Sequence, residues 1–324
     1  MAITVGNPLR PLLLAAAQSP KLERTVSGMK LTRKVVDRFV PGEAETSVVA
    51  AVRELLTSGR YVSVDYLGED TTDAAQATAT VAAYLSLLKA YATLDADAGE
   101  QPGSARKLEV SLKLSALGQA RPGRGREVAI DNARTVCAAA DEVGAWVTVD
   151  AEDHTTTDST LSIVRELRLD FPHLGTVLQA YLHRTEQDCR DLSGEGSRIR
   201  LCKGAYAEPA SVAYQKSAEV DSSYLRCLRV LMDGDGYPMV ASHDPTMIAA
   251  AKEYAQQAGR SAADHEFQML YGIRNEEQLR LVAEGEQMRV YVPFGDQWYG
   301  YFMRRLAERP ANLAFFLRSL VSRG

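Results

Sequence analysis

The sequence predicts a (β/α)8 barrel of the TIM type preceded by N-terminal helices. Eight short runs rich in β-branched and aromatic residues follow one another from about residue 61, and longer segments with apolar residues at helical spacing separate them. Eight strand-helix units in about 260 residues match this barrel in number and size. A doubly wound open sheet is the structural alternative, but no GxGxxG turn opens any of the predicted helices.

Residues 1–60 are expected to form an N-terminal helical segment that packs on a barrel of residues 61–324. In the stretch SVVAAVRELLTSG, we expect Ser47 to cap a helix and Gly59 to end it. The predicted strands are YVSVDYL, KLEVSLKL, AWVTVDA, GTVLQAY, RIRLC, YPMVASH, EFQML and RVYVPF. Segments such as EVAIDNARTVCAAADEVG and DSTLSIVRELRLDFP predict helices between them.

Alternation within the predicted strands gathers polar side chains on one face of each strand. The residues at these positions are Ser111, Lys113, Thr148, Asp150, Gln179, Arg200, Gln268 and Tyr291. If the apolar faces pack on the outer helices, this polar face points into the barrel near its C-terminal mouth, where barrel enzymes keep their chemistry. Burying Lys113, Asp150 and Arg200 together without pairing or a ligand would be costly, so the cluster predicts a polar pocket.

Composition narrows the class of protein. With 324 residues, 46% hydrophobic content and a net charge of −5 without runs of like charge, the chain reads as a soluble globular protein without a nucleic-acid surface. No apolar run approaches the roughly 18 residues of a membrane span. The cysteines form no CxxC pair and no metal-ligand spacing, which fits a reducing compartment. We therefore expect a cytoplasmic protein.

Three kinds of reaction compete for the predicted pocket. Metal-dependent hydrolysis or aldol chemistry could use the stretch DAEDH at residues 150–154 with His243, but the chain has five histidines and no HxH or HxxxH pair. A Schiff-base lyase or aldolase could use Lys113 or Lys203, each at the end of a strand. A cofactor-binding oxidoreductase would use the polar face to grip a bulky, charged ligand. The spacing leaves the last two open, and a densely charged mouth disfavours a non-catalytic binding module.

A resemblance favours the oxidoreductase. The segments VSLKLSALG, VDAED, VLQAYL, RIRLCKGAY, VASHD, EFQMLYG, YVPFG and WYGYFMRRLAERPAN resemble, in order, the signature blocks of the proline dehydrogenase (proline oxidase) family. The similarity runs from about residue 61 to 324, and VPGE with the helices before it resembles the family's N-terminal part. Single blocks are moderate signals, whereas the whole series is a strong one.

The resemblance implies a monofunctional bacterial enzyme that binds FAD in a (β/α)8 barrel. Such an enzyme oxidises L-proline to Δ1-pyrroline-5-carboxylate, with hydride transfer to the flavin and then electron transfer to a membrane quinone. The partners implied are L-proline, the quinone, peripheral contact with the inner face of a membrane, and a downstream pyrroline-5-carboxylate dehydrogenase. The last helix is implied to lie over the barrel mouth instead of in the outer ring.

The resemblance also assigns site residues, and it implies no metal. Catalytic roles are implied for Lys113, Asp150, Arg200 and Tyr291. Substrate contacts are implied for Lys113, Tyr206, Leu270, Tyr291, Arg304 and Arg305. FAD contacts are implied for Asp150, Gln179, Arg200, Lys203, Gly204, Ala205, His243, Asp244 and Glu308. In this scheme Lys113, paired with Asp150, helps hold the substrate carboxylate, while Arg200 approaches the reactive nitrogen of the flavin.

In the last helix, four polar residues are expected on one stripe and three apolar residues on the other face. The stripe comprises Tyr301, Arg304, Arg305 and Glu308, and the apolar face comprises Phe302, Met303 and Leu306. Two adjacent guanidinium groups over a pocket suit a carboxylate, because their fork geometry fixes its orientation. Positions that depart from the family pattern are Cys202 for valine, Ala207 for a larger residue, Asp244 for asparagine and Gly300 for proline.

Overall fold

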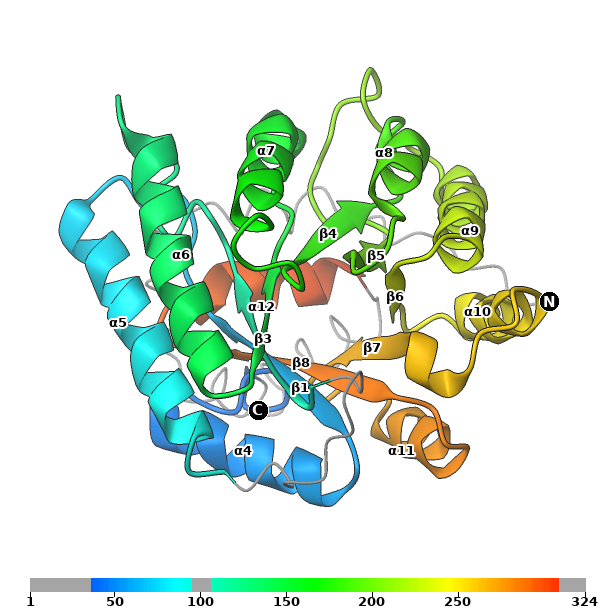
Figure 1. Ribbon diagram of the computed structural model, residues 1–324, viewed down its shortest axis with the longest axis horizontal. Helices are drawn as coiled ribbons and strands as arrows, with labels where there is room; N and C mark the ends of the chain where they lie inside the picture. The colour runs from blue at the N-terminus through cyan, green and yellow to red at the C-terminus, as the bar shows by residue number, and fades with distance from the viewer. Residues whose placement is uncertain (1–35, 95–105, 309–324) are drawn as a thin grey trace, which may run out of the picture.

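The computed structural model describes residues 36–94 and 106–308, with side chains described as far as Leu306. Parallel strands close into a barrel in the order β1 to β8, with β8 paired to β1, so the predicted barrel is confirmed (Figure 1). The strands are β1 Tyr61–Tyr66, β2 Leu108–Leu112, β3 Trp146–Val149, β4 Gly175–Gln179, β5 Arg198–Cys202, β6 Tyr237–Ala241, β7 Glu266–Leu270 and β8 Met288–Phe294. Seven of them lie within the predicted strand segments, and β8 begins one residue before its segment, at Met288.

Helices surround the barrel and cover the apolar faces of its strands. They are α4 Glu45–Thr57, α5 Ala74–Tyr91, α6 Gly125–Glu142, α7 Thr157–Leu167, α8 Thr185–Leu192, α9 Ser217–Asp233, α10 Pro245–Gln257 and α11 Asn275–Ala283, with short 3-10 turns η1 His154–Thr156 and η2 Ala262–Asp264. A further helix, α12 Trp298–Glu308, follows the last strand. The two helical segments predicted between strands correspond to α6 and α7, and the predicted helix in SVVAAVRELLTSG corresponds to α4. Within the described residues, no helix combines the length and apolar character that crossing a membrane requires.

The start of α4 differs from the prediction, whereas its end agrees. The helix begins at Glu45 with Ala44 as N-cap, so the capping role expected for Ser47 is wrong. Ser47 lies in the first turn, where its side chain packs against Gly42 closely enough that a Cβ on that glycine would come within 2.8 Å. At the other end Gly59 adopts a φ of +79°, a left-handed conformation that favours glycine and ends the helix. The expected boundary between a helical segment and the barrel at residue 60 stays a prediction, since residues 1–35 lie outside the described part.

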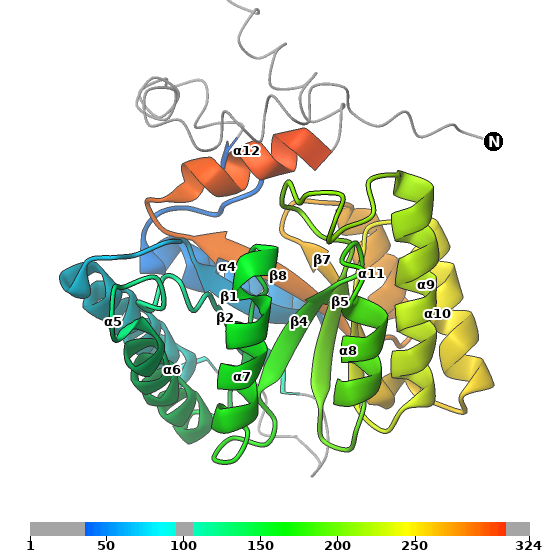
Figure 2. The same cartoon turned by 90° about the horizontal axis from the view of Figure 1, so that it is seen from above.

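The helices α4 and α12 do not follow the arrangement of a regular barrel, in which the helix after the last strand belongs to the outer ring. α4 packs outside β1 and β8, and its Val48, Val52 and Leu55 belong to the main core between helices and strands. α12 instead lies across the C-terminal end of the barrel, as Figure 2 shows and as the resemblance implied. Its Phe302 and Leu306 are buried in a second, separate apolar cluster.

Candidate active site

The inward-pointing side chains form three stacked layers along the barrel axis, because every second residue of a strand points inward. The lowest layer contains the buried charges Glu109, Arg198, Glu266 and Arg289. The middle layer contains Arg200 with the side chains around it, Ser63, Ser111, Gln268 and Tyr291. The layer nearest the mouth contains Asp65, Lys113, Asp150 and Gln179. Alternation therefore predicted the inward face correctly, but Arg200, Gln268 and Tyr291 lie one layer below the mouth.

Lys113 pairs with a residue that the resemblance did not point to. Its Nζ donates to Oδ2 of Asp65, so the expected direct pairing with Asp150 is wrong in this structure. Burial raises the pKa of Asp65 to about 6, although Lys113 opposes the rise. Burial would lower the pKa of Lys113, but the carboxylates of Asp65 and Asp150 outweigh it and raise that pKa. Lys113 is therefore held as a cation beneath the mouth.

Asp150 joins Arg200 and Tyr291 into one polar unit. Arg200 Nη1 donates to Oδ1 of Asp150 at 2.6 Å, and the Tyr291 hydroxyl donates to Oδ2 at 2.7 Å. The guanidinium of Arg200 also lies 5.3 Å from the centre of the Tyr291 ring. Arg200 is only 4% exposed, and the carboxylates of Asp150 and Glu109 raise its pKa despite burial. Asp150 thus uses both oxygens to fix one cation and one hydroxyl.

The loop after β5 carries the expected cofactor residues Lys203, Gly204 and Ala205. Lys203 Nζ lies 2.8 Å from Asp244 Oδ2 and 2.6 Å from Asp221 Oδ1, and these two carboxylates raise its pKa although burial opposes them. Gly204 has a φ of +111°, and a Cβ there would come within 2.3 Å of the Tyr181 ring. Glycine is therefore required for this loop to pass against Tyr181.

Arg304 connects α12 to the barrel. Its Nη2 and Nη1 donate to the two carboxylate oxygens of Glu69 at 2.5 and 3.1 Å, and its guanidinium lies 5.6 Å from the Tyr206 ring centre. The neighbouring Arg305 lies 5.1 Å over the ring of Tyr301. Tyr301 was expected on the polar stripe, yet it is 6% exposed because it packs into the second apolar cluster.

The remaining predicted residues lie around the same end of the barrel. Leu270 and Tyr291 pack against the apolar cluster beneath α12. The backbone N–H of Leu270 donates to Nε2 of His243 at 3.0 Å, which fixes that imidazole beside β7. Gln179 Nε2 donates to the carbonyl of Glu152 at 2.7 Å. Glu308 ends α12, but its side chain lies outside the described residues.

Residues of the stretch DAEDH have partners elsewhere in the loops. Glu152 accepts from the backbone N–H of Ser115 at 3.1 Å and from its hydroxyl, and burial raises the pKa of this carboxyl to about 7. His154 bonds Glu208 through both its ring Nδ1 and its backbone N–H, the latter at 2.9 Å. These side chains therefore join the loops after β2, β3 and β5.

Sequence reasoning missed several residues of the interior. Glu109, Arg198, Glu266 and Arg289 lie on the same strand faces as residues that were named, and Asp65 lies on the inward face of β1, so the period-two alternation could have found them. Glu69 and Glu208 lie in loops, where spacing carries no such signal.

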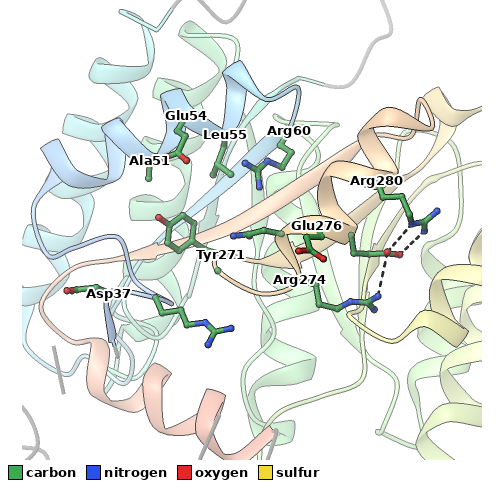
Figure 3. A pocket seen from close by; sticks show the side chains of 13 residues that line it. Asp37, Ala51, Glu54, Leu55, Arg60, Tyr271, Arg274, Glu276 and Arg280 are labelled. Atoms are coloured by element: carbon green, nitrogen blue, oxygen red, sulfur yellow. Dashed lines mark hydrogen bonds and ion pairs between the residues drawn. The ribbon is translucent and has the colours of Figure 1, made fainter. Parts of the chain in front are cut away.

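A groove of about 770 Å³ lies between α4 and α11 (Figure 3). Its charged lining residues are Asp37, Arg38, Glu54, Arg60, Arg274, Glu276, Glu277 and Arg280. Acidic and basic side chains balance in this groove, and none of the predicted site residues lines it. Arg60 is already bonded to Gln278 at 2.8 Å. The barrel mouth is therefore the better candidate for the active site.

Comparisons with known proteins show which family this chain belongs to. The sequence profile of the proline dehydrogenase family matches residues 48–318. A proline dehydrogenase of Deinococcus radiodurans is 38% identical over 314 residues, which cover 96% of this chain and 97% of that protein. Proline dehydrogenase 1 of Bacillus subtilis strain 168 is 36% identical over 315 residues, covering 97% of this chain and all of that protein, 100%.

Among solved structures, proline utilization A of Bdellovibrio bacteriovorus, inactivated by N-propargylglycine, matches with a TM-score of 0.78. The sequences are 24% identical, and the match covers 96% of this chain and 37% of that chain, so this likeness shows the fold. The family profile and the two full-length relatives show more: this chain belongs to the proline dehydrogenase family.

Proposed function

We propose that the enzyme oxidises L-proline to Δ1-pyrroline-5-carboxylate with FAD as the first electron acceptor and a membrane quinone as the second. One observation carries this proposal: the cations Lys113 and Arg304 and the unit of Asp150, Arg200 and Tyr291 converge on the C-terminal end of one barrel. A carboxylate substrate needs cations at one end, and its ring needs an apolar wall beside them.

The carboxylate of proline is assigned to Arg304, Arg305 and Lys113. An ammonium has three N–H donors, of which Lys113 gives one to Asp65, so it can also donate to a substrate oxygen. The ring of proline is assigned to Tyr206, Leu270 and Tyr291 at the same end of the barrel. These contacts orient the ring carbon next to nitrogen and keep water away from it.

The residues at the mouth fit an extended dinucleotide. Gly204, which precedes Ala205, lets the loop after β5 pass against Tyr181, and Lys203, whose side chain is 32% exposed, offers a cation suited to phosphate. The other residues assigned to FAD are Asp150, Gln179, Arg200, His243, Asp244 and Glu308. Bound FAD supplies the group that accepts two electrons. Arg200, held as a cation at the base of the mouth, stabilises negative charge that develops above it.

A Schiff-base lyase is the competing function, and the charge state of the lysines disfavours it. A lysine that attacks a carbonyl must be neutral, which requires a lowered pKa. Neighbouring carboxylates instead raise the pKa of both Lys113 and Lys203. The flavin-dependent oxidation is therefore the function that the site supports best.

The proposal also covers location and partners. A cytoplasmic enzyme that docks peripherally on the inner face of a membrane could reach a quinone without a spanning helix. An enzyme that oxidises pyrroline-5-carboxylate would consume the product. The bifunctional protein PutA of Escherichia coli, 29% identical to this chain over 351 residues that make up 26% of that protein, supports a link to a further activity.

The test is an absorbance spectrum of the purified protein. We expect flavin bands from non-covalent FAD, and we expect L-proline to bleach them in the absence of oxygen. A colourless protein that stays inactive after addition of FAD would contradict the proposal. Trapping of a substrate on Lys113 or Lys203 by borohydride would establish the Schiff-base function instead.

A further inference from the structure

Arg200 donates every N–H of its guanidinium to side chains inside the barrel. A guanidinium has five N–H donors, and five acceptors surround this one. They are Gln268 Oε1 at 2.5 Å from Nε, Asp150 Oδ1 at 2.6 Å and Ser111 Oγ at 3.0 Å from Nη1, and Glu109 Oε1 at 2.7 Å and Ser63 Oγ at 3.2 Å from Nη2. The orientation of this guanidinium is therefore set by the barrel.

Glu109 lies one layer below Arg200 and is fully buried. Its Oε1 accepts from Arg200, and its Oε2 accepts from Arg198 Nη2. Burial alone would raise the pKa of Glu109, but the guanidinium groups of Arg198, Arg289 and Arg200 outweigh it and leave that pKa well below its ordinary value. Glu109 is thus a carboxylate that bridges two buried arginines.

Arg198 makes this bridge rigid. Its guanidinium lies 3.7 Å from the centre of the Trp146 ring, and its Nη1 donates to the carbonyl of His173 at 3.2 Å. Glu109 is therefore anchored from below by a cation that the backbone of the barrel holds in place. Above it, the Nη1 edge of Arg200 bonds Asp150, whose side chain is 11% exposed at the mouth.

We propose that Glu109 is a positioning residue of the active site: it anchors Arg200 from below, so that the Nη1 edge with Asp150 is the part of Arg200 presented to the mouth. The proposal rests on the proposed function, because it concerns how Arg200 faces the bound cofactor and substrate. Glu109 touches neither and acts through Arg200.

The test compares three variants of the full chain loaded with FAD. Glu109→Gln keeps the shape and removes the charge. Glu109→Gln with Arg198→Met removes the same carboxylate but restores the charge balance. The matched control is Glu266→Gln, which removes the other buried glutamate of the same layer, whose ion pair is with Arg289 at 2.7 Å. Two measurements are made: the midpoint potential of FAD, and the anaerobic bleaching rate at increasing L-proline.

Glu109→Gln should raise the midpoint potential, because Arg200 and Arg198 keep their charge without their shared carboxylate. This shift can be expressed as a change in the equilibrium constant for reduction of FAD, in which a tenfold change corresponds to about 30 mV for two electrons. The double variant should return to within about twofold of the wild-type equilibrium constant for reduction. Both variants should nevertheless bleach at least about tenfold more slowly than wild type at saturating proline. Their proline dissociation constants should stay within about twofold of the wild-type value. Glu266→Gln also removes one buried negative charge and should raise the midpoint potential, but its bleaching rate and proline dissociation constant should stay within about twofold, because its ion pair is with Arg289.

Equal effects of Glu109→Gln and Glu266→Gln on the bleaching rate would overturn the proposal and leave Glu109 a general part of the buried core. An unchanged bleaching rate in Glu109→Gln would overturn it as well. If Glu109→Gln does not fold, the bleaching rate of the double variant tests the proposal instead, because that variant buries no uncompensated arginine. A wild-type protein that binds FAD but is not bleached by L-proline would contradict the proposed function alone, because the midpoint potentials need no substrate.

Discussion

Arg304 of α12 and Glu69 of the loop after β1 form a forked ion pair over the barrel mouth, with N–O distances of 2.5 and 3.1 Å. Glu69 takes one N–H from each terminal nitrogen of the guanidinium, so the fork leaves Arg304 further donors for a ligand. The same contact ties the covering helix to the barrel. Arg304 can therefore bind a substrate oxygen while Glu69 keeps it in place.

Replacing Arg304 or Arg305 with Met should weaken proline binding by about 1.5–3 kcal/mol, or about tenfold to a hundredfold, because each change deletes a charge-assisted bond. Met preserves the helix-forming tendency. A flavin-monitored titration with L-proline measures the effect. Arg229→Met, which removes a cation lying over Tyr254 on the outer surface, is the control. Loss of thermal stability with an unchanged proline titration would show that α12 merely presents a solvated face.

Tetrahydrofuran-2-carboxylate should compete with proline without bleaching the flavin. It keeps the ring size and the carboxylate, but an oxygen replaces the amine whose lone pair assists oxidation of the adjacent carbon. At about 100 times its dissociation constant it should stabilise the folded protein by about 2.7 kcal/mol. Cyclopentanone, which lacks the carboxylate, should do neither, since the ring contacts bury little apolar surface. If the carboxylate compound competes equally well in Arg305→Met, then Arg305 does not hold the carboxylate.

The stability of the protein should fall as the pH rises from about 4.5 to about 7, in part because of Glu152. Burial raises the pKa of this carboxyl from 4.5 in the unfolded chain to about 7, so the folded state holds the proton more tightly. Its contribution is complete below the unfolded pKa and is lost as the pH passes the folded one. At about 1.4 kcal/mol per pKa unit this corresponds to about 3 kcal/mol. Denaturant unfolding at several pH values measures it.

Glu152→Gln should flatten this pH dependence, because the amide stays neutral and keeps an acceptor for Ser115. Asp65, whose folded pKa is about 6, should leave a smaller slope of the same sign in the variant. Identical slopes in the variant and the wild type would show that Glu152 ionises normally in the folded protein.

Gly204→Ala should destabilise the protein and weaken FAD binding, because the new Cβ would come within 2.3 Å of the Tyr181 ring at a φ of +111°. Gly196→Ala is the matched control, since that glycine has a φ of +73° and no atom within 4 Å of a built Cβ. In the control, the free energy of unfolding should fall by only about 1–2 kcal/mol, which is the cost of a left-handed backbone conformation for a residue with a Cβ. Thermal unfolding and a FAD titration compare them. Equal losses would mean that the Tyr181 contact is unimportant.

The sequence was sufficient for the barrel because hydrophobic periodicity depends on local spacing. Alternation identified the inward face, and thus Lys113, Asp150 and Arg200, without any knowledge of contacts. Alternation could not give the relative heights of these residues along the barrel axis or their ion-pair partners, because the stagger of the strands decides which carboxylate lies next to each cation. Lys113 consequently pairs with Asp65 of the neighbouring strand, not with Asp150.

Loop residues and the covering helix were less accessible to sequence reasoning. The ion pair of Arg304 with Glu69 joins residues 235 positions apart in the chain, and no periodic pattern relates them. The position of α12 over the mouth came from resemblance, because an amphipathic helix after the last strand fits the outer ring equally well. Burial of Tyr301 followed from that position.

The separation of the two apolar clusters has a consequence for how the molecule fluctuates. The wall of the barrel is completed by α4, a helix that precedes the first strand, while α12 rests on a cluster of its own. Undocking α12 therefore need not disturb the packing between strands and outer helices. Backbone amides of α12 should exchange with deuterium through a local opening, well before those of β1 and β8. Traffic of substrate and product through the mouth could then proceed without partial unfolding of the scaffold.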